Sequence, residues 1–120
     1  MKVTVDIKFE YDIKPSVEYT GKGKNEKKIC DKIFYYIRFH NTVLSKGVIT
    51  KKDIETISYM SNMGIDFYEV LLKNISIQII NECKYKLNID VDEESFYNEN
   101  TEFLVEFIDE LKNKVDELMG

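Results

Sequence analysis

The sequence lacks the features of a membrane or secreted protein. No apolar run approaches the ~20 residues that span a bilayer. The first six residues alternate apolar and polar side chains, two of the latter charged, where a signal peptide would be uniformly apolar. We therefore expect a cytoplasmic protein with no membrane partner. Trp and Ala are absent and Arg occurs once, whereas Lys, Ile, Asn and Tyr abound. This bias fits AT-rich codon usage and indicates a low-GC bacterium, its phage or a mobile element.

Shortages of histidine and cysteine exclude most catalytic and metal chemistries. His40 is the only His, so Ser-His-Asp, paired-His metal and two-His acid–base sites are all excluded. Cys30 and Cys83 are too few for a disulfide framework and lack the spacing of a zinc site. We expect both thiols to be buried small apolar groups and His40 to be a partly buried structural residue. A Cys83–His40 pair stays geometrically open, whereas Cys30 and His40 would lie about 15 Å apart along one helix. The sequence therefore predicts no catalytic, cofactor-binding or metal-binding residues.

Two partial motifs fail at defined positions. The segment from Gly21 to Lys28 mixes Gly and Lys before an expected helix, but a phosphate-binding loop needs Gly where Glu18 stands. A calcium loop that begins at Asp90 needs Gly at its sixth position and Glu at its twelfth, where Ser95 and Thr101 stand. We therefore expect the first segment to be an exposed loop and the second to be an acidic linker.

Length and composition favour a single domain, residues 1–120, of the α+β class. Of the 120 residues, 43% are hydrophobic and 32% are charged, which suffices for one core. The first eleven residues alternate apolar and polar side chains, as a half-buried strand does. Pro15 and the alternation of Val17 with Tyr19 predict a turn and an edge strand. Residues 2–20 are therefore expected to form an N-terminal β-hairpin.

The hairpin is expected to pack against about four helices. The first begins at Asn25 and ends near Gly47. Thr50 and Asp53 form a capping box for the second, which ends at Gly64. The apolar positions of the first helix follow the helical spacing of three and four: Ile29, Ile33, Tyr36, Ile37, His40 and Leu44.

Two longer helices complete the helical part, residues 25–119. Asp66 begins the third helix with another capping pattern. Its β-branched segment, residues 74–80, leaves a central strand open as the alternative, although helical flanks favour a helix. Asn100 or Thr101 caps the final helix, which is long, amphipathic and acidic on its outer face. Its apolar stripe comprises Leu104, Phe107, Ile108, Leu111, Val115 and Leu118.

Charge is distributed unevenly along the chain, whose net charge is -5. Residues 1–89 carry 15 basic and 11 acidic side chains, whereas residues 90–120 carry 2 basic and 11 acidic ones. A row of carboxylates on a rigid helix can imitate nucleic acid and occupy the basic groove of a partner. Such a row forms the predicted partner-binding face of the final helix: Glu102, Glu106, Asp109, Glu110, Asp116 and Glu117.

These features favour a small non-enzymatic protein that binds and modulates or inhibits a larger host protein with a basic surface. The sharpest version is a phage or mobile-element inhibitor of a host nucleic-acid-processing or defence nuclease complex. Direct nucleic-acid binding is less favoured, because Arg with an aromatic platform is the usual signature and Arg38 stands alone. As an accessory factor of that kind, the chain would use Lys22, Lys24, Lys27, Lys28 and Lys32. A homodimer and a small-ligand enzyme or sensor also stay open.

Overall fold

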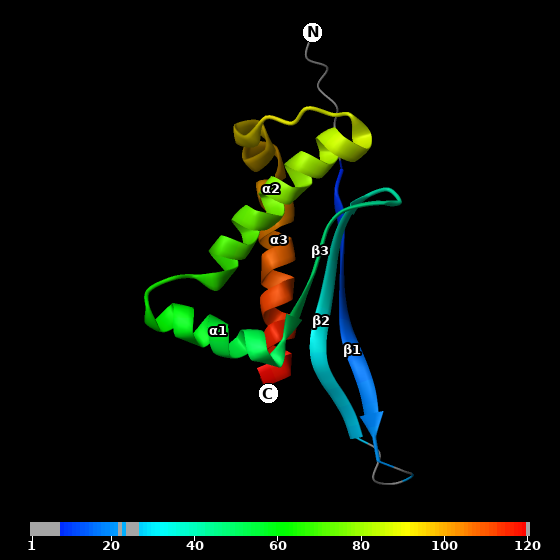
Figure 1. Cartoon of the computed structure of the whole chain (residues 1–120), viewed down its shortest axis with the longest axis vertical. Coiled ribbons are helices and arrows are strands. Elements are labelled where there is room, and N and C mark those ends of the chain that lie inside the picture. Colours follow the sequence, from blue (N-terminus) through cyan, green and yellow to red (C-terminus); the bar gives the residue numbers. More distant parts are fainter. Residues whose placement is uncertain (1–7, 22, 24–26, 120) are drawn as a thin grey trace.

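The structure is a computed structural model that describes residues 8–21, 23 and 27–119, with residues 17–20, 27–30 and 119 described by their backbone alone. Along the described chain the elements are β1 (Glu10–Thr20), β2 (Lys27–Phe39), β3 (Thr42–Thr50), α1 (Lys51–Asn62), α2 (Phe67–Leu87) and α3 (Glu93–Met119). The strands form an antiparallel sheet in the order β1-β2-β3. The helices lie to one side of this sheet (Figure 1). The fold therefore belongs to the expected α+β class.

The expected hairpin within residues 2–20 is wrong. Its second half is a continuous strand, β1, which pairs with β2 so that Ile13 lies opposite Tyr35. Pro15 is tolerated inside this strand because β1 forms an edge of the sheet, where a missing N–H need not break the ladder. The start of the expected hairpin, up to residue 7, lies outside the described residues.

The first expected helix, from Asn25 to Gly47, is also wrong, because this segment forms β2, a tight turn and part of β3. Ile33 and Ile37 are four residues apart, which suits one face of a helix and equally one face of a strand. Tyr35, between them, is also buried, and this alternation shows the period of a strand. The run of β-branched and aromatic residues also favours a sheet. Asn25, the expected cap, lies outside the described residues.

The two helices that follow the sheet begin where their capping residues predict. The Asp53 carboxylate accepts hydrogen bonds from the Thr50 backbone N–H at 2.8 Å and from the Thr50 hydroxyl at 3.1 Å, at the start of α1. The Asp66 side chain accepts from the Tyr68 N–H at 3.0 Å, at the start of α2. Residues 74–80 are helical, so the alternative of a central strand is wrong.

The final helix is longer than expected and is kinked. It begins at Glu93, before the predicted cap at Asn100 or Thr101. Asn100 leaves helical geometry, with φ -116° and ψ 15°, and its side chain donates to the Phe96 carbonyl oxygen at 3.0 Å. The described chain therefore has three helices in place of about four, because the first expected helix forms strands instead.

The core lies between the inner face of the sheet and the helices α2 and α3. Tyr35 of β2 packs edge-on against Phe107 of α3, with ring centroids 5.8 Å apart. Ser45 of β3 donates to Gln78 Oε1 of α2 at 2.7 Å, a polar link between sheet and helix. The predicted apolar stripe of α3 is confirmed, because every member is buried: Leu104, Phe107, Ile108, Leu111, Val115 and Leu118. Among the described residues, none of the helices combines the length and apolar character needed to cross a bilayer.

Candidate functional site

The outer side of α3 carries a shallow groove of about 590 Å³. Because the apolar stripe of this helix faces the core, the residues between its members point outward. Val105 lines the groove and is 52% exposed. Thr101 and Asn113 also line it. Four of the predicted partner-binding residues supply its charge, and we call the whole surface the acidic groove: Glu102, Glu106, Asp109 and Glu110.

Tyr11 of β1 holds two of these carboxylates in place. Its hydroxyl hydrogen-bonds to Glu106 Oε1 at 3.1 Å and to Glu110 Oε2, and its ring packs edge-on against Phe103 and Phe107. The hydrogen bond to Glu110, then burial, then the bond to Glu106 raise the pKa of Tyr11 above that of a free phenol. The hydroxyl therefore keeps its proton at neutral pH and ties two carboxylates of the groove to the sheet.

The remaining two residues of the predicted acidic face are exposed but do not line the groove. Asp116 lies near Tyr68 of α2, where burial and then the charge of Asp116 raise the pKa of the phenol to about 12. Glu117 forms an ion pair with Lys114 at 3.7 Å. The acidic groove therefore includes the N-terminal part of the predicted face, from Glu102 to Glu110, and does not include Asp116 and Glu117.

The alternative lysine site falls mostly on residues whose side chains the structure does not describe. Lys22 and Lys24 lie outside the described residues, and Lys27 and Lys28 are placed by their backbone alone, at the start of β2. Lys32 is exposed on the same strand. A strand, β2, and not the expected helix begins at Lys27.

His40 and the cysteines occupy separate places. His40 is exposed in the turn between β2 and β3, with a φ of 51°, so the expectation of a partly buried histidine is wrong. Cys83 of α2 is fully buried, and burial raises the pKa of its thiol. Cys30 precedes His40 by ten residues along β2, which at the strand rise separates them by about 30 Å. Within the described part of the chain, no group of three or more His, Cys, Asp or Glu residues could hold a metal ion.

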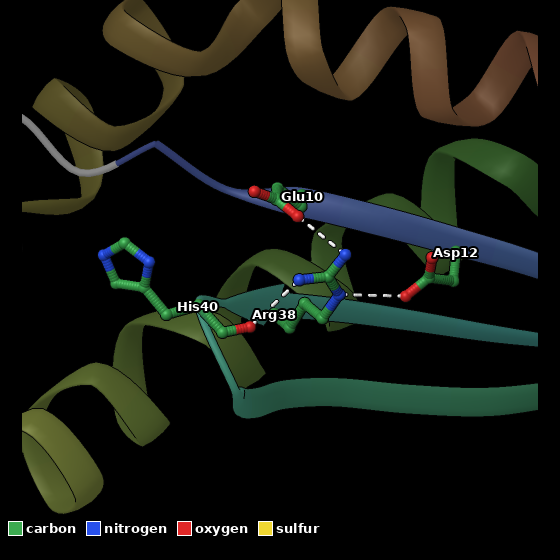
Figure 2. Close-up of polar contacts among 4 residues, drawn as sticks. All are labelled: Glu10, Asp12, Arg38 and His40. Carbon is green, nitrogen blue, oxygen red and sulfur yellow. Dashed lines mark hydrogen bonds and ion pairs between the residues drawn. The ribbon is translucent and has the colours of Figure 1, made fainter.

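A polar cluster that the sequence did not predict lies on the face of the sheet opposite the helices. Figure 2 shows Arg38 of β2 with its ion-pair partners from β1, Glu10 at 2.6 Å and Asp12 at 3.0 Å. The same guanidinium donates to the His40 carbonyl oxygen at 3.0 Å. The cluster depends on pairing between β1 and β2, which the helix expected in place of β2 did not allow for. The aromatic and β-branched run of residues 33–37 is a strand signal that could have predicted this pairing.

Comparison of the chain with models of protein families, with curated proteins and with solved structures gives no match.

Proposed function

We propose that this protein is a non-enzymatic binding protein of the cytoplasm that docks its acidic groove on a basic surface of a larger protein and modulates or inhibits it. The observation that carries this proposal is the gathering of four exposed carboxylates along one groove of α3. Arg and Lys side chains that bind phosphate also bind carboxylate, so a surface built for nucleic acid is the natural counterpart of this groove.

Geometry supports docking in two ways. Glu102, Glu106 and Glu110 are each four residues apart, so their backbone positions recur about every 6 Å along the helix. This gives a regular row of negative charge that steers a basic partner and speeds the encounter. Tyr11 already restrains two of these side chains, so less rotamer entropy is lost when a partner orders them.

The partner that fits this surface best is a host nucleic-acid-processing complex, a defence nuclease included, with the chain encoded by a phage or mobile element. An enzyme that binds a phosphate backbone carries a groove lined by Lys and Arg. A rigid row of carboxylates on a small protein fills such a groove and blocks the substrate. The amino-acid bias of the chain, rich in Lys, Ile, Asn and Tyr, fits AT-rich codons and supports a low-GC host of this kind.

The experiment is an affinity purification from host lysate after nuclease treatment, with wild type and two charge variants. The groove variant is Glu102→Lys with Asp109→Lys, which spares the partners of Tyr11. The matched control is Glu55→Lys with Glu69→Lys, exposed positions on α1 and α2 that change the net charge equally. We expect wild type and control to retain one stoichiometric protein, and the groove variant to lose it.

Competition then identifies the surface that the partner uses. Duplex DNA added to the purified complex is expected to displace the protein, and the affinity should fall as salt rises. The proposal is wrong if no protein partner survives nuclease treatment, or if both charge variants retain the partner as tightly as wild type does.

A further inference from the structure

The face of the sheet opposite the helices is built from alternate residues of its three strands. In β2, the side chains of Ile33, Tyr35 and Ile37 are buried toward the helices. Because successive side chains of a strand point to opposite faces, Phe34 and Tyr36 point away from the core. The central strand therefore presents two neighbouring aromatic rings on the uncovered side.

The register of the sheet places lysines around these rings. Phe34 lies opposite Lys14 of β1 on one side and Val48 of β3 on the other. Tyr36 lies opposite Lys46 of β3 on one side and Asp12 of β1 on the other. Lys14 Nζ is 6.0 Å from the centre of the Tyr36 ring, so the ammonium and the ring share a face. Val48 is 43% exposed, and Phe34 and Tyr36 are half-buried. The helices lie on the other side of the sheet (Figure 1), so no described helix covers this face.

This surface, which we call the open sheet face, is basic on an acidic protein. Lys14, Lys32 and Lys46 are all exposed. Among the side chains that the structure describes, Glu10 and Asp12 are the acidic residues placed on this face, and both form ion pairs with Arg38 at one end of it (Figure 2). The chain has a net charge of -5, so the charge of this face is opposite in sign to the net charge of the protein. The open sheet face comprises Lys14, Lys32, Phe34, Tyr36, Lys46 and Val48.

We propose that the open sheet face binds a single strand of nucleic acid. Bases stack on Phe34 and Tyr36 regardless of sequence, because every base has a π face. The surrounding ammonium groups contact the phosphates and release their counterions. This function goes beyond docking of the acidic groove, which lies on α3 at the helical side of the sheet.

The spacing of the rings selects a single strand over a duplex. Two residues along a strand are about 6.6 Å apart, roughly twice the rise of about 3.4 Å per base in duplex DNA. Consecutive bases can therefore reach Phe34 and Tyr36 only after they unstack, which an intact duplex does not permit. A second copy of the same face is a poor occupant, because it would bring like charges together across a symmetric interface.

The test is fluorescence anisotropy with labelled oligothymidine and oligouridine of about 12 nucleotides, and with a DNA duplex of the same length. We expect the wild-type protein to bind the single strands more tightly than the duplex. Phe34→Leu with Tyr36→Leu keeps apolar side chains on the face but removes the rings, and should weaken binding at least about fivefold. Tyr85→Leu, at an 86% exposed position on α2, is the control and should bind as wild type does.

The lysines are tested through the salt dependence of binding. Lys14→Gln with Lys46→Gln should lower the slope of log affinity against log salt concentration by about 1.4, because two phosphate contacts are lost. Lys52→Gln with Lys73→Gln, exposed positions on α1 and α2, should leave the slope unchanged. If circular dichroism shows that the Phe34→Leu and Tyr36→Leu variant does not fold, the Lys14→Gln and Lys46→Gln variant decides whether the open sheet face binds the strand.

Three results would overturn the proposal. The first is an absence of single-strand binding by the wild-type protein at low salt. The second is duplex binding as tight as single-strand binding, or equal losses in the face variants and their controls. The third is a wild-type dimer in sedimentation experiments that the Phe34→Leu and Tyr36→Leu variant converts to monomer, since a second copy would then cover the face.

Discussion

At the scale of single residues, the packing of the core requires a residue without a side chain at position 47. A Cβ atom at this position would lie 2.1 Å from the hydroxyl oxygen of Tyr35 and 2.3 Å from its Cζ atom. Tyr35 lies directly opposite Gly47 in the sheet and is buried. The aromatic ring therefore lies across the backbone of β3 at the glycine. In this arrangement the ring packs against the backbone and covers the glycine from solvent.

We expect Gly47→Ala to destabilise the protein, because the added methyl group overlaps a buried ring. The expected loss is about 1–3 kcal/mol of unfolding free energy, the usual cost of overpacking. Urea denaturation measures it. Lys46→Ala, at the exposed neighbouring position, is the control and should change the free energy by no more than about 0.5 kcal/mol. Equal denaturation midpoints for Gly47→Ala and wild type would show that Tyr35 does not occupy this space.

Tyr68 makes the stability of the protein sensitive to alkaline pH. Burial, followed by the charges of Asp116 and Asp66, raises its pKa from 10.0 to about 12. Because the folded state favours the protonated phenol, its contribution to stability is complete below pH 10 and is lost as pH rises through about 12. Tyr68→Phe should therefore lose less stability than wild type between about pH 10 and pH 12, as measured by thermal unfolding.

The control for this pH dependence is Tyr85→Phe, at a highly exposed position of α2. It should follow the wild-type curve. Tyr11 and Tyr35 also have raised pKa values, so Tyr68→Phe should reduce the alkaline loss and not abolish it. An unchanged slope in Tyr68→Phe would mean that the phenol titrates alike in the folded and unfolded states.

At the scale of elements, α1 depends on its N-terminal cap more than on the core. None of its side chains is buried, and Ile54 and Ile57 are only half-buried. Its first turn is held by the hydrogen bonds from Thr50 to the Asp53 carboxylate. A helix with few buried contacts opens at a lower free energy than the core elements do.

We expect Asp53→Ala to cost about 1 kcal/mol and to speed hydrogen exchange of the α1 amides. The amides of α3, whose apolar stripe is buried, should exchange at the wild-type rate under conditions where the protein opens locally. Glu55→Ala, at an exposed position of the same helix, is the control and should leave exchange in α1 unchanged. Exchange in α1 that does not respond to Asp53→Ala would show that tertiary contacts, and not the cap, hold this helix.

At the scale of the whole molecule, the sheet separates two surfaces of opposite charge. The acidic groove belongs to α3 on the helical side, and the lysines of the open sheet face lie on the other side. The net charge of -5 describes neither surface, since it averages over both. Their variants share no residues, so failure of the groove variant to lose its partner leaves the strand-binding test intact.

Local chemistry in the sequence was enough to predict several features correctly. The caps at Thr50 and Asp66 depend on hydrogen bonds within a few residues of chain. The buried stripe of α3 and its exposed acidic residues follow from helical periodicity over a segment without competing strand signals. In each case the interactions that decide the structure lie within the segment itself.

Only the tertiary structure decided what the first part of the chain becomes and which surfaces it builds. The spacing of Ile33 and Ile37 suits a helix and a strand alike, so the segment takes its form from its hydrogen-bonding partners in β1 and β3. The open sheet face exists only because three strands pair in one register. Likewise, Tyr11 reaches Glu106 across 95 residues of sequence. Such contacts depend on how separate segments pack together, which the periodicity of any one segment does not encode.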